Sequence, residues 1–357
     1  MKSLRVIVAG LLFAPPVVAV ATETQTSLLH PNFVTAATAS EMAATAGRGD
    51  AWTSYASAET VADEHSSGDA APSEFCGGDS YCSCNCDSSG WCNLPIQPSV
   101  HCFDDFISPI SNPVYFEDPR TLSEARFIFL NHKVPNPAGG GDVQLYALQI
   151  RAALTDRLSL IATKDGYIVS SNPLIDDGWA DIAAGLKYNL FSDPCSQQLF
   201  SAGIVYEAPS GTHDALQGNG DGTFDFFLSG GALICPKGHW VGAAGVVQPV
   251  NSGDESTWSY VSNHFDYFLG HCTYALMEYN WYHYLESGDG GLQGVEGGDL
   301  FNFGSTGVAG NDIVTCAFGA KFKPDRCTEI GIAWEVPLTE RRDVLENRIT
   351  FDYIRRF

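Results

Sequence analysis

Cysteines are the residues of this chain with the clearest capacity for chemistry. The sequence has eleven, and six of them fall within residues 76–102, where three form a Cys-x-Cys-x-Cys run. In an exported chain a dense, even set of cysteines is typical of a disulfide framework, whose pairing a sequence cannot give. Three closely spaced thiolates could instead bind a soft metal ion. No histidine pair at zinc-finger spacing accompanies them, so we favour disulfides and assign no metal. The disulfide candidates are Cys76, Cys82, Cys84, Cys86, Cys92, Cys102, Cys195, Cys235, Cys272 and Cys327.

One cysteine must stay unpaired or bond to another chain, because eleven is an odd number. We expect this to be Cys316, which lies in the middle of an alternating segment on the same face as Val314 and Phe318. The later candidates fall beside predicted turns, where they could pair with each other or with the Cys-rich segment, residues 76–102.

Other residue patterns give little support for an enzyme. Gly-x-Ser-x-Gly is absent, and His283 has no accompanying serine motif. His264 and Asp266 are two residues apart and can be neighbours on one strand face, where we expect two hydrated polar residues. Asn219-Gly-Asp-Gly222 resembles the start of a calcium loop but lacks the closing glutamate. We therefore predict no enzymatic activity and no cofactor.

The elements that must position these residues begin at residue 123. From there, amphipathic segments of ~10 to 13 residues alternate with turns, and a tilted strand of ~9 to 11 residues spans a bilayer. Within 179–191, for example, Ile182, Leu186 and Tyr188 share one face, whereas Asp181 and Lys187 lie on the other. The twelve segments are 123–133, 142–154, 158–170, 179–191, 198–208, 223–235, 239–250, 258–270, 273–285, 312–323, 328–338 and 348–357.

The links between these segments alternate in length. Links after the even-numbered segments are short, and those after the third, fifth, seventh, ninth and eleventh are mostly longer and rich in Gly, Asp, Asn and Ser. Short turns in the periplasm and long loops outside are typical of outer-membrane barrels. This phase places the Cys-rich segment, the turn cysteines and Phe357 on the periplasmic side.

Both ends of the chain agree with export to the outer membrane. Residues 1–21 read as a signal peptide: Lys2 and Arg5, an apolar run, and a small-residue cleavage site at Ala21. At the other end Ile349, Phe351 and Tyr353 alternate before the terminal Phe357. The chain here resembles bacterial outer-membrane β-barrel proteins, except that Arg355 stands where that family usually has an apolar residue. The resemblance implies that Tyr353 and Phe357 belong to the signal read by the barrel-insertion machinery.

Charge on the segments has two possible roles. The net charge of −23 argues against nucleic-acid partners and against binding to anionic lipid surfaces. The inward faces carry both positively and negatively charged side chains. These charges could form a structural network that fills a narrow lumen, or they could line a selective pore. A girdle at the membrane interface is predicted, with sugar stacking as the alternative, from the aromatic residues Trp258, Tyr260, Tyr279, Trp281, Tyr282 and Tyr284. The lumen-lining candidates are Arg126, Arg151, Asp181, Lys187, Glu207, Asp266, Glu278, Lys321, Glu329, Glu335 and Asp352.

These observations predict four parts: a signal peptide (1–21), a disordered tail (22–75), a Cys-rich segment with a lead-in or plug (76–122) and an antiparallel twelve-stranded β-barrel in the outer-membrane lipid (123–357). Residues 103–122 carry several prolines and could lie at the periplasmic mouth or enter the barrel. The size and the lead-in from Ser111 to Arg120 weakly resemble the transporter family labelled for the meta pathway of phenol degradation, which implies passage of small aromatic or apolar solutes. We expect a narrow channel or transporter for small solutes. The alternatives are a non-transporting barrel that anchors the Cys-rich segment and a secreted carbohydrate-binding β protein.

Overall fold

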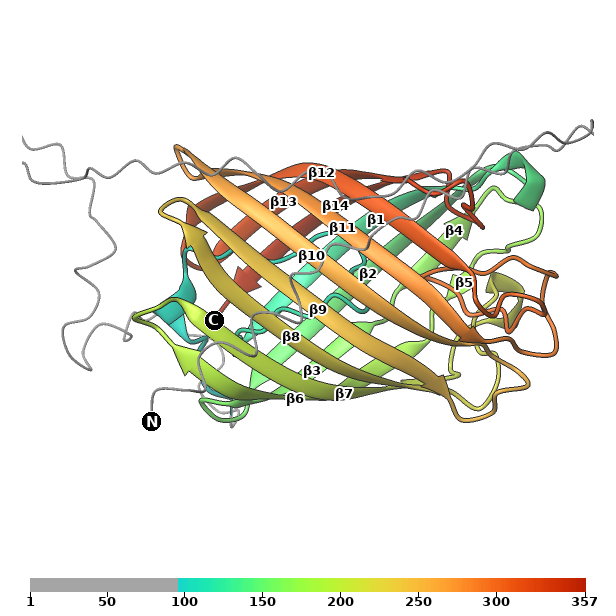
Figure 1. Cartoon of the computed structure of the whole chain (residues 1–357), viewed down its shortest axis with the longest axis horizontal. Helices are drawn as coiled ribbons and strands as arrows, with labels where there is room; N and C mark the ends of the chain where they lie inside the picture. Colours follow the sequence, from blue (N-terminus) through green and yellow to red (C-terminus); the bar gives the residue numbers. More distant parts are fainter. Residues whose placement is uncertain (1–95) are drawn as a thin grey trace, which may run out of the picture. The chain divides into compact units, whose positions relative to one another are not determined.

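The computed structural model describes residues 96–357 and shows antiparallel strands joined into a sheet that closes on itself (Figure 1). The expectations for residues 1–21, 22–75 and 76–92 lie outside the described residues. Within the described part, the helices are the short 3₁₀ turns η2 (His101–Phe103), η3 (Asn136–Ala138) and η4 (His213–Ala215). No helix among residues 96–357 is long and apolar enough to cross a membrane.

Fourteen runs of strand follow one another along the chain. They are β1 (Glu124–Lys133), β2 (Asp142–Ala153), β3 (Leu158–Lys164), β4 (Tyr167–Ser170), β5 (Gly178–Trp179), β6 (Ile182–Asp193), β7 (Gln198–Ala208), β8 (Thr223–Cys235), β9 (Gly238–Pro249), β10 (Thr257–Gly270), β11 (Thr273–Glu286), β12 (Asp312–Asp325), β13 (Thr328–Pro337) and β14 (Asn347–Arg356).

These runs make twelve barrel strands, because two strands are interrupted. β3 and β4 both pair with β2 and are the two halves of one strand, broken at residues 165–166. β5 pairs with β4 and β6 pairs with β3, so they too form one strand, broken at residues 180–181. The predicted twelve-stranded antiparallel barrel is therefore confirmed. The two breaks, in neighbouring strands, were not predicted.

The barrel closes between its first and last strands. β1 pairs with β14 along its whole length, from Glu124 opposite Arg356 to Lys133 opposite Asn347. Closure leaves the sheet without an open edge, which is a requirement for strands that span a membrane. It also places the start of β1 and the end of β14 at the same end of the barrel as the five short turns (Figure 1). We call this end the periplasmic mouth, following the rule that turns are periplasmic and long loops are outside.

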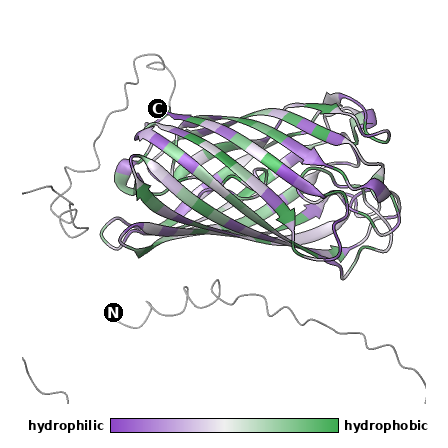
Figure 2. Ribbon diagram, turned by 90° about the horizontal axis from the view of Figure 1, so that it is seen from above, coloured by the Kyte–Doolittle hydropathy of each residue, from purple (hydrophilic) through white to green (hydrophobic). Residues whose placement is uncertain are grey.

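Residues alternate between the two faces of the wall. In β6, Ile182 is 57% exposed and Leu186 is 45% exposed, whereas Lys187, the residue after Leu186, is 2% exposed. Apolar residues recur along the strands, with more hydrophilic residues towards the loops (Figure 2). An apolar exterior around a charged interior is the arrangement of a transmembrane barrel, because lipid solvates only the outer face. The protein is thus an outer-membrane β-barrel, and a secreted soluble β protein does not fit its surface.

Candidate functional site

The interior of the barrel is occupied by a stretch of chain that precedes β1. We call residues 99–123 the inner segment. Every residue from Phe106 to Ser123 is buried, although none of them belongs to a strand or helix. Its entry at the periplasmic mouth is fixed by main-chain bonds at Phe357, whose carbonyl accepts the Ser99 N–H at 2.8 Å and whose N–H donates to the Ser123 carbonyl at 2.9 Å.

Carboxylates of the wall accept the backbone N–H groups of the inner segment. Glu278 on β11 accepts from Ile110 at 2.9 Å and from Ser111 at 2.6 Å. Glu329 on β13 accepts from Ser108 at 3.1 Å. The proline-rich inner segment forms no sheet of its own, so these bonds supply acceptors for its backbone N–H groups. Buried N–H groups without an acceptor are costly.

Cations and amides of the wall bind the carbonyl groups and acids of the same segment. Arg151 bonds to Glu117 at 2.6 Å, and Lys187 bonds to it at 2.7 Å. Arg126 donates to the Pro109 carbonyl at 2.8 Å, and Gln149 donates to the Pro113 carbonyl at 2.7 Å. Wall residues from strands on several sides thus hold the segment by side-chain bonds.

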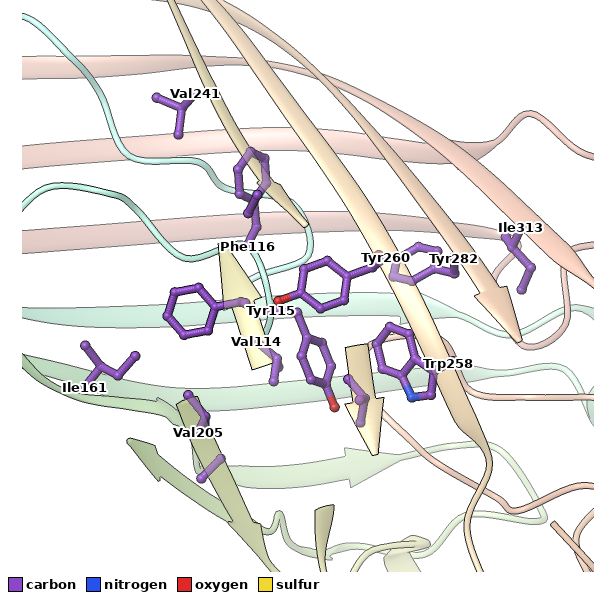
Figure 3. Packing of buried hydrophobic residues seen from close by; sticks show 14 of the residues in the cluster. Val114, Tyr115, Phe116, Ile161, Val205, Val241, Trp258, Tyr260, Tyr282 and Ile313 are labelled. Carbon is purple, nitrogen blue, oxygen red and sulfur yellow. The ribbon is translucent and has the colours of Figure 1, made fainter. Parts of the chain in front are cut away.

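Apolar packing fills the middle of the lumen beside these polar contacts. Val114, Tyr115 and Phe116 lie among inward side chains from several strands (Figure 3). The Tyr115 ring is 4.7 Å from Trp258 and 5.5 Å from Tyr260, measured between ring centroids. Room for the segment comes partly from Gly331, where an added Cβ would lie 2.4 Å from an oxygen of Asp352 and 3.0 Å from Ile110.

Tyr279 and Trp281 are partly exposed on the outer face of β11, but the predicted aromatic girdle is wrong for Trp258, Tyr260, Tyr282 and Tyr284. All four are at most 3% exposed and belong to the interior cluster. Tyr282 and Tyr284 stand an even number of residues from Glu278 on the same strand and therefore share its inward face. That parity was the signal in the sequence that could have placed them inside.

All eleven predicted lumen residues face the interior, and each has an ionic or hydrogen-bonding partner there. Lys321 and Arg126 both bond to Asp352, at 2.8 and 2.9 Å, and Lys321 is also 3.6 Å from Glu329. Further contacts are Lys164–Glu207 at 2.5 Å, Arg348–Glu335 at 2.6 Å, Asp181 with the Gly211 N–H at 2.8 Å, and the pairs of Arg151, Lys187 and Glu278 given above. In this arrangement the charges form a paired network around the inner segment.

His264 and Asp266 are not the hydrated pair that the sequence suggested. His264 is fully buried and lies 2.6 Å from Glu278 and 3.3 Å from Asp266, which in turn is 2.8 Å from His239. The inner segment covers this face, because Phe106 packs on His239 and Ile110 and Ser111 bond to Glu278. Among residues 96–357 no group of three or more His, Cys, Asp or Glu side chains is arranged to hold a metal ion.

Several interior residues were missed. Arg348 joins Glu335 to Asp299 of an extracellular loop, and Arg356 joins Glu124 to Glu329 at 3.1 and 2.8 Å. Both arginines have the parity of Asp352 on β14, which indicates the inward face. The acids Glu117 and Asp118 with Arg120 lie on the inner segment, where no periodicity marks them.

The extracellular end is covered by the long loop of residues 287–311. Its Leu300, Phe301 and Val308 are at most 5% exposed. Glu296 accepts from the Phe303 and Ser305 N–H groups at 2.9 and 2.8 Å. Asp299 bonds to Arg348 at 2.7 Å. The Asp299–Arg348 ion pair therefore ties the loop to β14, whereas the Glu296 bonds join parts of the loop to each other.

Nearby, Glu255 lies in the loop between β9 and β10. Burial, reinforced by the neighbouring Glu207 carboxylate, raises the pKa of Glu255 from 4.5 to about 8. One of its carboxyl oxygens is buried without a hydrogen-bond partner.

A separate pocket opens on the outer wall where the two interrupted strands meet. Its volume is about 480 Å³. The Asp165 carboxylate at the break accepts the Leu148 N–H at 2.8 Å, in place of a ladder bond from β3. Gly166 has a φ of +115°, a left-handed backbone conformation that favours glycine. The lining includes the lipid-facing side chains Phe127, Tyr146, Leu148, Trp179 and Ile182.

The cysteines divide between the mouth and the wall. Cys102 and Cys327 are disulfide-bonded. Cys195, Cys235 and Cys272 are exposed beside the short turns, and the thiols of Cys235 and Cys272 are free in this structure. Cys235 and Cys272 lie on separate solvent-exposed turns and form no disulfide among the described residues. Their expected pairing stays a prediction. Cys316 is a free, buried thiol, as expected.

Comparisons with known proteins give similarity of structure only. No protein-family model matches the chain, including any for the phenol meta pathway, and no curated protein matches it. A COG4313 outer membrane channel from Pseudomonas putida F1 is similar over 71% of this chain and 100% of its own, with 14% identity and a TM-score of 0.46. The NanC porin covers 66% of this chain and 98% of its own (6% identity, TM-score 0.42), and the KdgM porin covers 66% and 99% (11%, 0.38).

Proposed function

We propose that this protein is an outer-membrane channel for small solutes whose lumen is occupied by the inner segment. One observation carries the proposal: a continuous buried stretch, Phe106 to Ser123, lies inside a closed barrel and is held by side chains of the wall. A solute can cross the lumen only when this segment moves aside.

The way in which the segment is held supports a displaceable plug. It adds no strand to the wall, so its removal breaks no ladder of the barrel. Its polar contacts are hydrogen bonds and ion pairs to side chains such as Glu278, Arg151 and Lys187. Once exposed, these charged groups can be solvated by water, which lowers the cost of losing their partners. A barrel of twelve strands lies between the filled ~8-stranded and the open ~16-stranded cases, so the passage would be narrow.

The pocket on the outer wall supports apolar solutes as a second possibility. Its lining of aromatic and aliphatic side chains faces lipid, and Asp165 is also among the lining residues. A small apolar molecule with a hydroxyl or amine group would find both kinds of contact there.

Conductance of the purified protein in planar bilayers tests the channel. The full chain should give small or rare openings, and a variant lacking residues 106–118 should give a conductance several times larger. Heat-modifiable gel migration establishes in parallel that the variant has folded. A folded variant that leaves the bilayer sealed would refute the channel and favour a barrel that only anchors its periplasmic segment. Liposome swelling with graded solutes then gives the size limit.

A further inference from the structure

Aromatic side chains line one side of the lumen towards its extracellular end. Trp258 and Tyr260 point inward from β10, and Tyr282 points inward from the neighbouring β11, with its ring centroid 5.9 Å from that of Trp258. The Tyr115 ring of the inner segment packs on these rings and meets Trp258 edge-on (Figure 3). Val308 of the covering loop belongs to the same buried cluster. The cluster therefore lies between that loop and the inner segment.

The polar end of Tyr115 is surrounded by acids. Its hydroxyl group lies within electrostatic reach of the carboxylates of Glu207, Asp225, Glu255 and Asp299. Negative charges that share a poorly solvated interior repel one another, and a cation placed among them is strongly attracted. A neutral phenol thus stands at a point of the lumen that electrostatics favours for a positive charge.

Two of these carboxylates form no ion pair among residues 96–357. Asp225 on β8 is 6% exposed and accepts a hydrogen bond from the Tyr260 hydroxyl at 3.1 Å. Glu255 is 5% exposed, and one of its oxygens is buried without a hydrogen-bond partner. Lys164, the cation of this region, bonds to Glu207 at 2.5 Å. A buried carboxylate without a cation is costly unless it takes up a proton or binds a cationic ligand.

An organic cation suits this combination of groups better than a metal ion does. Among the described residues no group of three or more His, Cys, Asp or Glu side chains is arranged to hold a metal. An organic ammonium ion gains from the faces of aromatic rings as well as from carboxylates. An aryl ring in the place of the Tyr115 ring would contact Trp258, and a short alkylammonium chain on it would extend towards Asp225 and Glu255.

We propose that Trp258, Tyr260 and Asp225 form a binding site for arylalkylammonium solutes, which Tyr115 occupies until such a solute displaces it. The proposal rests on the proposed function, because it takes the ligand to be a solute of the channel. The solute ring and the Tyr115 ring need the same surface, so binding of one excludes the other. A solute that binds only when Tyr115 has left shifts the inner segment towards its displaced position.

Calorimetric titration of the solubilised full chain tests the site without depending on conductance. Phenethylammonium is the probe, and phenethyl alcohol and phenylacetate are matched neutral and anionic probes. The ammonium ion should bind roughly tenfold more tightly than either, the scale of one added charged contact. Equal affinities for the three probes, or tighter binding of phenylacetate, would overturn the proposal.

Substitutions with opposite expected effects locate the ligand. Asp225→Asn should weaken phenethylammonium binding roughly tenfold, whereas Tyr115→Ala should strengthen it, because the competing ring is gone. Asp312→Asn is the matched control: it removes one negative charge at the same end of the barrel, but Asp312 is exposed and bonds to Trp281 and His283. Heat-modifiable migration establishes folding, and Tyr115→Ala decides the matter if Asp225→Asn does not fold. Equal effects of the two Asp→Asn variants, or no gain from Tyr115→Ala, would show that the proposal is wrong.

Conductance separates this site from the channel itself. In planar bilayers phenethylammonium should raise the frequency of large openings, and phenylacetate should not. Bilayers that stay sealed while the calorimetric pattern holds would refute the channel and leave the site. A conducting protein without that pattern would refute the site and leave the channel.

Discussion

Replacing Glu278 by glutamine should loosen the inner segment and open the channel more often. The wild-type carboxylate is fully buried and accepts two backbone N–H groups, from Ile110 and Ser111. Glutamine has the same shape, but its amide offers one oxygen and one NH₂ group, so at least one of the two N–H donors faces another donor. Losing a hydrogen bond to a charged acceptor costs about 1.5–3 kcal/mol.

That loss corresponds to a roughly 10- to 100-fold larger population of the displaced segment, at about 1.4 kcal/mol per factor of ten. Single-channel recording should detect it as a higher frequency of large openings. Glu335→Gln is the matched control: Glu335 is equally buried and charge-paired, but its bonds go to Arg348, Thr315 and Asn280 and none among the described residues goes to the inner segment. Equal opening frequencies in the two variants would refute the proposal that the inner segment plugs the channel.

Three other outcomes are expected. Gly166→Ala should distort the outer-wall pocket, because its φ is +115° and the new Cβ would lie 2.4 Å from the Tyr146 carbonyl oxygen; weaker binding of an apolar fluorophore, with the barrel still folded, would be the readout. Protection of the β9–β10 loop from hydrogen exchange should fall as pH rises from 4.5 through about 8, since the folded state holds the Glu255 proton more tightly, and Glu255→Gln should abolish that dependence. Deletion of Phe357 should lower the yield of inserted barrel without changing the conductance of molecules that do insert; normal yield would contradict its role as an assembly signal.

The wall of the barrel could be predicted from the sequence, because apolar and polar side chains must alternate along a strand between lipid and a polar interior. Ile332 and Trp334 are more than half exposed, and Glu329 and Glu335 on the same strand are at most 1% exposed, as the alternation predicts. Arg355 also follows the pattern. Its side chain is 43% exposed and reaches Thr328 and Asp325 near the mouth, where water can solvate it.

The contents of the interior were harder to predict from the sequence, for two physical reasons. The inner segment has neither a helical nor a strand period, so its burial depends on partners far away in the chain, such as Ser108 with Glu329. The breaks at Asp165–Gly166 and Ala180–Asp181 interrupt only the hydrogen-bond ladder and not the run of apolar residues, so hydropathy alone does not reveal them. The inward aromatics could have been identified, because Tyr260 shares the parity of His264 on β10.

The main-chain bonds of Phe357 imply an order of assembly. The inner segment precedes β1, yet its two ends are fixed by Phe357, which directly follows β14, the strand that closes the barrel. Its wall partner Glu329 also belongs to the penultimate strand. The segment therefore cannot reach its final bonds until the barrel is nearly complete, and the wall must close before the lumen can fill.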